Sequence, residues 1–142
     1  MRSYLVLRVV AKLLLPFILL FALYVQFHGD FGPGGGFQAG VIFASGFILY
    51  AIIYGLRAAE QVLPRGILRF GYSLGVLIFA GVGVYDLLLG GKFLDYSVMA
   101  RDPAHGQHVG IFLVEFGIGI AVASVMVSVF FTFARRSKDQ KD

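Results

Sequence analysis

Residues 27–40 read FHGDFGPGGGFQAG and separate two long apolar runs of the chain. Glycine supplies six of these fourteen residues, and His28 and Asp30 lie at the entrance of the segment. Glycine adopts positive φ angles that other residues avoid, whereas Pro33 fixes its own φ and removes a backbone donor. The segment therefore predicts a loop of defined shape, followed by a new apolar helix from Phe37.

The backbone of this loop is the first candidate for a functional site. The N-terminus of a helix carries unsatisfied amide donors and partial positive charge, and glycine carbonyls ahead of it can turn toward a cation. The loop lacks the Gly-Lys-Ser or Gly-Lys-Thr ending of a phosphate-binding loop, which argues against nucleotide binding. We therefore expect an ion path or gate, whose candidate residues here are His28, Asp30, Pro33, Gly34, Gly35, Gly36 and Phe37.

The composition is that of a membrane protein. Of the 142 residues, 58% are hydrophobic and 14% are charged, and the mean hydropathy is +0.84, which is too apolar for a soluble domain. Stretches that reach the roughly 20 residues needed to cross a bilayer as a helix lie at about 9–27, 37–56, 68–89 and 109–133. The sequence predicts an all-α integral membrane protein with four transmembrane helices in a single membrane domain, residues 1–142.

The basic residues predict how the spans are oriented. Ten of the 12 Lys and Arg residues lie in residues 2–12, 57–69 and 135–141, and such residues are retained on the cytoplasmic side. We expect both termini in the cytoplasm and a multi-pass protein of the cell membrane. No small-residue cleavage site follows the first apolar run, so we interpret it as a retained span and not as a signal peptide. The net charge of +4 then reflects topology and contact with lipid headgroups, and gives no support to nucleic-acid binding.

One acidic residue falls inside the fourth expected span. Glu115 lies past residue 109 by six positions, which is roughly 9 Å along a helix. A charged side chain exposed to lipid costs about 3 kcal/mol, so we expect Glu115 to face protein, a neighbouring subunit or water. Our hypothesis is that it relays a proton or a cation. The alternative is a structural hydrogen bond to a facing helix.

Other polar groups are expected on the same outer side of the membrane. Asp86 lies near the outer end of the third span, where it either joins an ion path or simply reaches interfacial water. Imidazole titrates near neutrality and carboxylates supply oxygen ligands, so such groups are suited to protons or a hard monovalent cation. The set on this side comprises His28, Asp30, Asp86, His108 and Glu115.

A metal centre and a cofactor are not expected. His105 and His108 with Asp102 have a spacing compatible with a metal, but no third imidazole lies nearby. The chain has no cysteine, which excludes disulfides and thiolate ligands.

Small residues are spaced for close helix packing. In lipid, helices associate through small residues one turn apart. A transporter that works alone usually carries internal repeats, and none is evident here, so the sequence favours a subunit of a larger assembly. The glycines expected at helix contacts are Gly40, Gly71, Gly75, Gly110 and Gly117.

Two segments carry a resemblance to a known family. His28-Gly29-Asp30 followed by residues 33–40, and residues 108–115 ahead of the Gly-, Val- and Ile-rich fourth span, resemble the MnhB/MrpB family of small membrane subunits in the multisubunit Mrp-type (Mnh or Pha) cation/proton antiporters. The resemblance covers essentially the whole chain, although Ala39 stands where many family loops have a second glycine. It implies no cofactor and a secondary-transporter subunit, not an enzyme. The implied partners are large antiporter-like subunits, other small membrane subunits, Na+ or K+, and protons.

Two roles remain open for the chain within such a complex. As a conduit, the loop and the start of the second span form a narrow passage with Phe37 as a plug and Pro33 holding the backbone shape. As a structural adaptor, the loop packs on partner subunits and Glu115 satisfies a buried donor. An alternative host for the adaptor is an Mrp-related respiratory hydrogenase-type complex.

Overall fold

The computed structural model describes residues 4–29 and 34–141. Two of the expected site residues, Asp30 and Pro33, lie outside them. The elements in chain order are α1 (Leu5–His28), α2 (Gly36–Tyr54), α3 (Leu56–Val62), α4 (Arg65–Leu88), the 3₁₀ helix η1 (Tyr96–Met99) and α5 (Pro103–Asp139). In the described chain, α1, α2, α4 and α5 are the four helices that are long and apolar enough to span a membrane. The prediction of an all-α membrane protein with four spanning helices is therefore confirmed.

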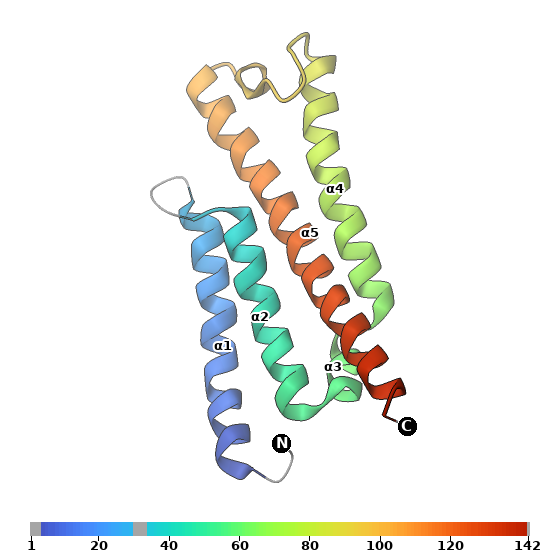
Figure 1. Ribbon diagram of the computed structural model, residues 1–142. Coiled ribbons are helices and arrows are strands. Elements are labelled where there is room, and N and C mark those ends of the chain that lie inside the picture. Colours follow the sequence, from blue (N-terminus) through green and yellow to red (C-terminus); the bar gives the residue numbers. More distant parts are fainter. Residues whose placement is uncertain (1–3, 30–33, 142) are drawn as a thin grey trace.

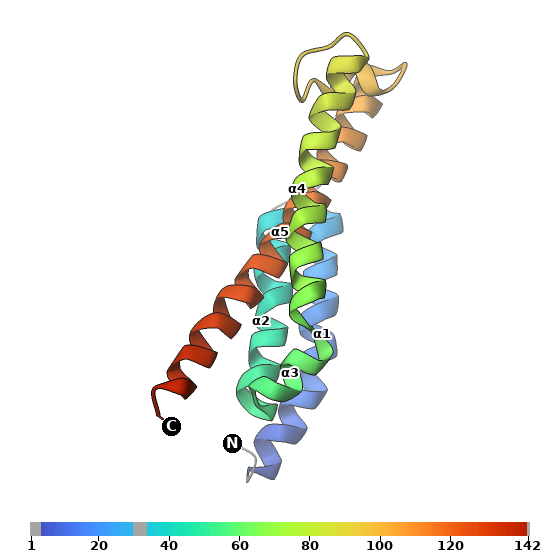
Figure 2. The same cartoon turned by 90° about the vertical axis from the view of Figure 1, so that its right-hand side faces the viewer.

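Helix α5 is the axis around which the others are arranged (Figures 1 and 2). It packs against both α2 and α4, and α1 packs mainly against α2. With 37 residues, α5 is roughly 55 Å long at 1.5 Å per residue. The end of α1 and the start of α2 lie beside its middle, whereas the connection from α4 folds over its first turns (Figure 1).

The helix boundaries differ from the expected spans for local reasons. Helix α5 begins at Pro103, well ahead of residue 109, because Asp102 caps it with a 3.1 Å hydrogen bond from the Ala104 amide to its carboxylate. Proline at the first helical position is compatible with such a cap. Helix α2 stops at Tyr54, because Gly55 has a φ of 99° and redirects the chain into α3.

The glycines expected at helix contacts lie at close contacts, with backbone at Gly40 and Gly75 and with side chains at Gly71 and Gly110. A Cβ built on Gly40 of α2 would lie 2.7 Å from the carbonyl oxygen of Gly119 in α5. One built on Gly75 of α4 would lie 2.5 Å from the carbonyl oxygen of Gly117. A Cβ on Gly71 would overlap Ser124 of α5, and one on Gly110 would overlap the Tyr96 ring of η1.

A cluster of buried apolar side chains lies where α2, α3, α4 and α5 meet. It includes Ala59, Leu68, Val127 and Phe131. The first turn of α1 and the last turn of α5 lie at this same end of the molecule (Figure 1). The α4–α5 connection lies at the opposite end (Figure 1).

Candidate functional site

The side chain of Glu115 lies against the glycines that flank the loop. A Cβ built on Gly29 would be 3.0 Å from Glu115 Oε2, and one built on Gly35 would be 3.4 Å from Glu115 Oε1. The carboxylate therefore occupies the space that side chains at these two positions would fill. The sequence placed Glu115 and the loop entrance only on the same expected side of the membrane, and the structure puts the Glu115 carboxylate directly against Gly29 and Gly35.

The start of α2 reaches the backbone of α5 at the same residue. A Cβ on Gly36 would overlap the carbonyl oxygen of Glu115 and lie 2.8 Å from its carbonyl carbon. Gly35, directly before the helix, has a φ of 138°, a backbone conformation that glycine adopts without strain. The carboxylate thus lies beside a helix N-terminus, where the macrodipole and the first amides favour negative charge.

Glu115 lies farther from the start of α5 than the expected span implied, because the helix begins before residue 109. Counted from Pro103, Glu115 is twelve residues into the helix, roughly 18 Å along its axis. Non-helical backbone at membrane depth is tolerated where it is buried in protein or lines a watery cavity. The close approach of α2 to α5 buries Gly35 and Gly36, which meets the first of these conditions.

Aromatic side chains surround the site on the α1 side. His28, the last residue of α1, stacks on Tyr24 with ring centroids 5.0 Å apart. Phe27 stacks on Phe112 of α5 at 5.8 Å. His28 is half-buried and directly precedes Gly29, so an imidazole is held close to the candidate site.

Phe37 and His108, unlike the half-buried His28, are exposed. Phe37 is 61% exposed. His108 precedes Glu115 by two turns, which places both on the same face of α5, about 10 Å apart along the axis. The remaining expected loop residue, Gly34, packs against α1, where a Cβ would lie 2.9 Å from the Val25 carbonyl oxygen.

Asp86 forms a second, separate polar centre. It is 0% exposed, and among the described residues neither carboxylate oxygen has a hydrogen-bond partner. The α4–α5 connection covers it, so it does not reach the surface of the chain as the alternative interpretation expected. Its acidic neighbour is Asp95, and Tyr96 lies close enough to interact with its charge. The structure thus does not group Asp86 with Glu115.

Two residues of the α4–α5 connection that covers Asp86 have shifted pKa values. The Ser97 hydroxyl donates a 2.6 Å hydrogen bond to Asp95 Oδ1, and this bond holds the pKa of Asp95 below its ordinary value. Burial raises the pKa of Tyr96, and the negative charge of Asp86 adds to that rise. Both effects keep Asp95 ionised and Tyr96 neutral near pH 7.

Replacing Asp86 by asparagine is expected to stabilise the isolated chain. A buried carboxylate without a partner costs free energy, and a neutral amide of the same shape costs less. We expect a gain of about 1 kcal/mol, measured as a higher thermal unfolding midpoint in detergent. An unchanged or lower midpoint would show that the carboxylate has a stabilising partner.

Gln26 is a buried polar residue that the sequence analysis did not single out. It lies in α1, is 6% exposed, and its Nε2 has no partner within residues 4–29 and 34–141. Its Oε1 lies 2.6 Å from where a Cβ on Gly119 would be. The sequence offered one signal for this burial, which is that Gln26 follows the small residue Ala22 by one helical turn. Both residues are buried in the structure.

Gln26 lines an apolar groove of about 410 Å³. The groove runs between the α1–α2 pair and α4, with α5 as its floor. Phe43 and Phe47 of α2 line one side, and Phe70 of α4 lines another. Gln26 is thus one of the few polar groups in an otherwise apolar surface.

The residues with metal-like spacing do not assemble into a cluster. Asp102 caps α5, and His105 and His108 are both exposed on the first turns of that helix. No group of three or more His, Asp or Glu residues that could hold a metal ion occurs in the described part of the chain.

The chain is similar to known proteins along most of its length. Residues 6–128 match a family model described as a domain related to the MnhB subunit of Na+/H+ antiporter. Proteins named "Putative antiporter subunit mnhB2" from Staphylococcus aureus strains Newman, JH1 and COL are each 37% identical to this chain over 127 residues. The match covers 87% of this chain and 89% of each relative.

Proposed function

The chain belongs to the MnhB family of Na+/H+ antiporter subunits, and from this membership we propose that it takes part in the ion path of a multisubunit antiporter. The complex exchanges Na+ or K+ for protons across the cell membrane, and both termini of this chain face the cytoplasm. Glu115 is the group that takes up and releases the proton or the cation. Its partners are the large antiporter-like subunits and the other small membrane subunits.

The observation that carries this role is the position of the Glu115 carboxylate against Gly29 and Gly35. A carboxylate inside a spanning helix is costly unless it faces protein or water. Here its neighbours are glycine backbone and the N-terminus of α2. In transporters, helix ends and non-helical backbone at membrane depth are typical components of ion sites. We assign His28, Gly34 and Phe37 to the rim of this site, whereas Asp30 and Pro33, which lie outside the described residues, stay candidates from the sequence alone.

The function is tested in everted membrane vesicles. Vesicles from cells that make the complete set of antiporter subunits are compared with vesicles that lack only this chain. We expect added NaCl or KCl to dissipate a preformed pH gradient in the first and not in the second. Equal dissipation in both would overturn the proposal. Proton movement that requires a reductant and ignores the added cation would favour the hydrogenase-type host instead.

A role as a structural adaptor is the second candidate. The apolar groove and the buried Nε2 of Gln26 favour it, because a helix from another subunit that carries an acceptor oxygen would fill both. In that case small-residue contacts and Glu115 serve assembly alone.

Phe37→Ala separates the two candidates. If Phe37 is a plug in the path, exchange falls roughly tenfold while the yield of the complex is unchanged, since an exposed phenylalanine contributes little to the fold. The control is Phe133→Ala, a phenylalanine of similar exposure, 68%, near the end of α5. Loss of the complex with Phe37→Ala alone would favour the adaptor.

A further inference from the structure

A basic pocket of about 390 Å³ lies between the first turns of α4 and the last turns of α5. It is far from Glu115, at the end of the molecule where α3 joins α4. Four arginines line it, and Asp139 is the acidic residue in its wall. These arginines are Arg65, Arg69, Arg135 and Arg136.

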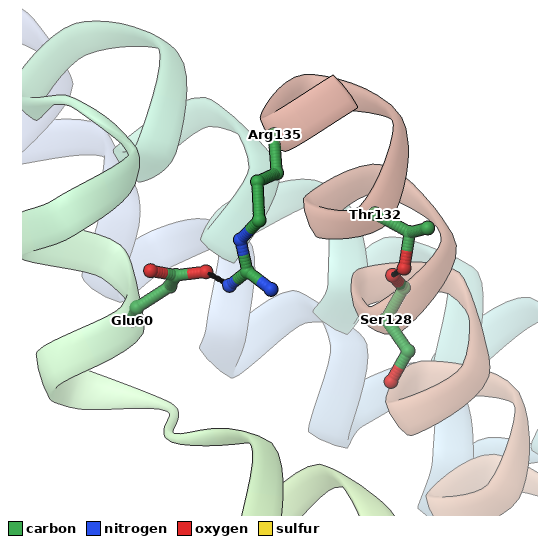
Figure 3. Close-up of polar contacts among 4 residues, drawn as sticks. All are labelled: Glu60, Ser128, Thr132 and Arg135. Carbon is green, nitrogen blue, oxygen red and sulfur yellow. Dashed lines mark hydrogen bonds and ion pairs between the residues drawn. The ribbon is translucent and has the colours of Figure 1, made fainter. Parts of the chain in front are cut away.

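The pocket follows from the periodicity of two helices. Arg65, Arg69 and Tyr72 are spaced four and three residues apart on α4, so their side chains share one face. On α5, Ser128, Thr132 and Arg136 repeat every four residues and face them. Figure 3 shows Ser128, Thr132 and Arg135 in succession along α5. The two stripes form the walls of the pocket.

The guanidinium groups are its available donors. The Ser128 hydroxyl donates to the Ser124 carbonyl, and the Thr132 hydroxyl donates to the Ser128 carbonyl, both at 2.8 Å. Arg135 pairs with Glu60 of α3 (Figure 3). By contrast, Arg65, Arg69 and Arg136 form no ion pair with any residue that the structure describes. The pocket therefore holds positive charge that α3 neutralises only in part.

Its depth matches that of lipid headgroups. Leu68 and Phe131, both buried, line the pocket on its inner side, where the apolar run of α4 begins and that of α5 ends. Arg65, Arg135 and Arg136 lie on the outer side of this boundary, and Arg69 directly follows Leu68 at the boundary itself. The pocket therefore has an apolar inner part and a cationic mouth at the edge of the spanning segments.

We propose that this pocket binds a phosphate-bearing anion, which at this depth is the headgroup of an anionic phospholipid. The planar fork of arginine matches phosphate oxygens, and pairs of arginines bind phosphate more strongly than dispersed surface charges do. Basic pockets between spanning helices are suited to such headgroups. The phosphate lies between Arg65 and Arg69 on one wall and Arg136 on the other, and the acyl chains extend along Leu68.

The test uses native mass spectrometry of the full-length chain in detergent. Phosphatidylglycerol, phosphatidylcholine and inorganic phosphate are the probes. We expect the double variant Arg65→Gln/Arg69→Gln to bind phosphatidylglycerol about 25-fold more weakly, since the loss of each arginine–phosphate hydrogen bond costs about fivefold. The control is Arg57→Gln/Lys138→Gln, which removes the same charge from two exposed residues outside the pocket and should leave this affinity within about twofold, because exposed charges contribute little.

A second variant guards against misfolding. Arg136→Gln, on the opposite wall, should weaken phosphatidylglycerol binding about fivefold and leave phosphatidylcholine binding unchanged. Equal losses in the control and pocket variants would overturn the proposal, because binding would then depend on net charge alone. Displacement of phosphatidylglycerol by equimolar inorganic phosphate would overturn the lipid assignment. Pocket variants that lose association with partner subunits but keep lipid affinity would show that an acidic protein segment is the ligand.

Discussion

Gly36→Ala is expected to prevent the chain from accumulating in folded form. A Cβ at this position would overlap the carbonyl oxygen of Glu115 and lie 3.0 Å from its Cα. These are backbone atoms, so no side-chain rotation relieves the overlap, and α2 must move away from α5. Overpacking of a close contact costs up to about 3 kcal/mol, or more where backbone must shift, a large share of a typical folding free energy of about 5–15 kcal/mol.

The measurement is the yield of monodisperse chain after extraction in detergent, together with its thermal unfolding midpoint. The matched control is Gly81→Ala in α4, where a built Cβ has no atom within 4 Å. There alanine should be neutral or stabilise the helix by up to about 1 kcal/mol. If Gly36→Ala behaves like Gly81→Ala, the close contact between α2 and α5 at Glu115 does not exist in the protein.

Glu115→Gln is expected to abolish cation-dependent proton exchange while the complex still assembles. Glutamine keeps the shape and hydrogen-bonding reach of glutamate but cannot release a proton or carry charge. Loss of a positioned proton-transfer group lowers a rate by about 100-fold or more. The assay is the decay of a pH gradient in everted vesicles on addition of NaCl or KCl, with complex yield measured in parallel.

Two variants make this result interpretable. Asp102→Asn is the same chemical change on the same helix, and asparagine caps helices as well as aspartate does, so exchange should be unchanged. Glu115→Asp keeps the carboxylate but withdraws it by one methylene from Gly29 and Gly35, so exchange should be intermediate. Full activity of Glu115→Gln at every pH would rule out Glu115 as a proton or cation relay. Loss of the complex with normal turnover in what remains would support the adaptor.

Hydropathy was sufficient to predict the four spanning helices. The apolar runs are long enough to leave no other architecture, and residues 34–36 supplied the glycines that separate the first helix from the second. The start of α5 could also have been predicted, because Asp102-Pro103 is a capping signal. Hydropathy overlooked it, since the first turns of α5 are polar.

Which residues come together at the site could not be predicted from the sequence, because it depends on how the helices are positioned along one another. Whether Glu115 meets the loop depends on the axial stagger between α2 and α5, and this stagger is set by the long-range contact of Gly36. The separation of Asp86 from Glu115 has the same origin, because the α4–α5 connection covers one and α2 meets the other. Gln26 was missed because it follows a run of bulky residues, and only the packing of α1 on α5 reveals that it is buried.

The most direct test of the central claim is infrared difference spectroscopy of the purified complex on addition of Na+. A carboxylate that exchanges a proton for a cation changes its stretching band, so we predict a carboxyl difference signal in the native complex and in Asp102→Asn that is absent in Glu115→Gln. An identical difference spectrum in all three would contradict the assignment of Glu115 as the ion-handling group.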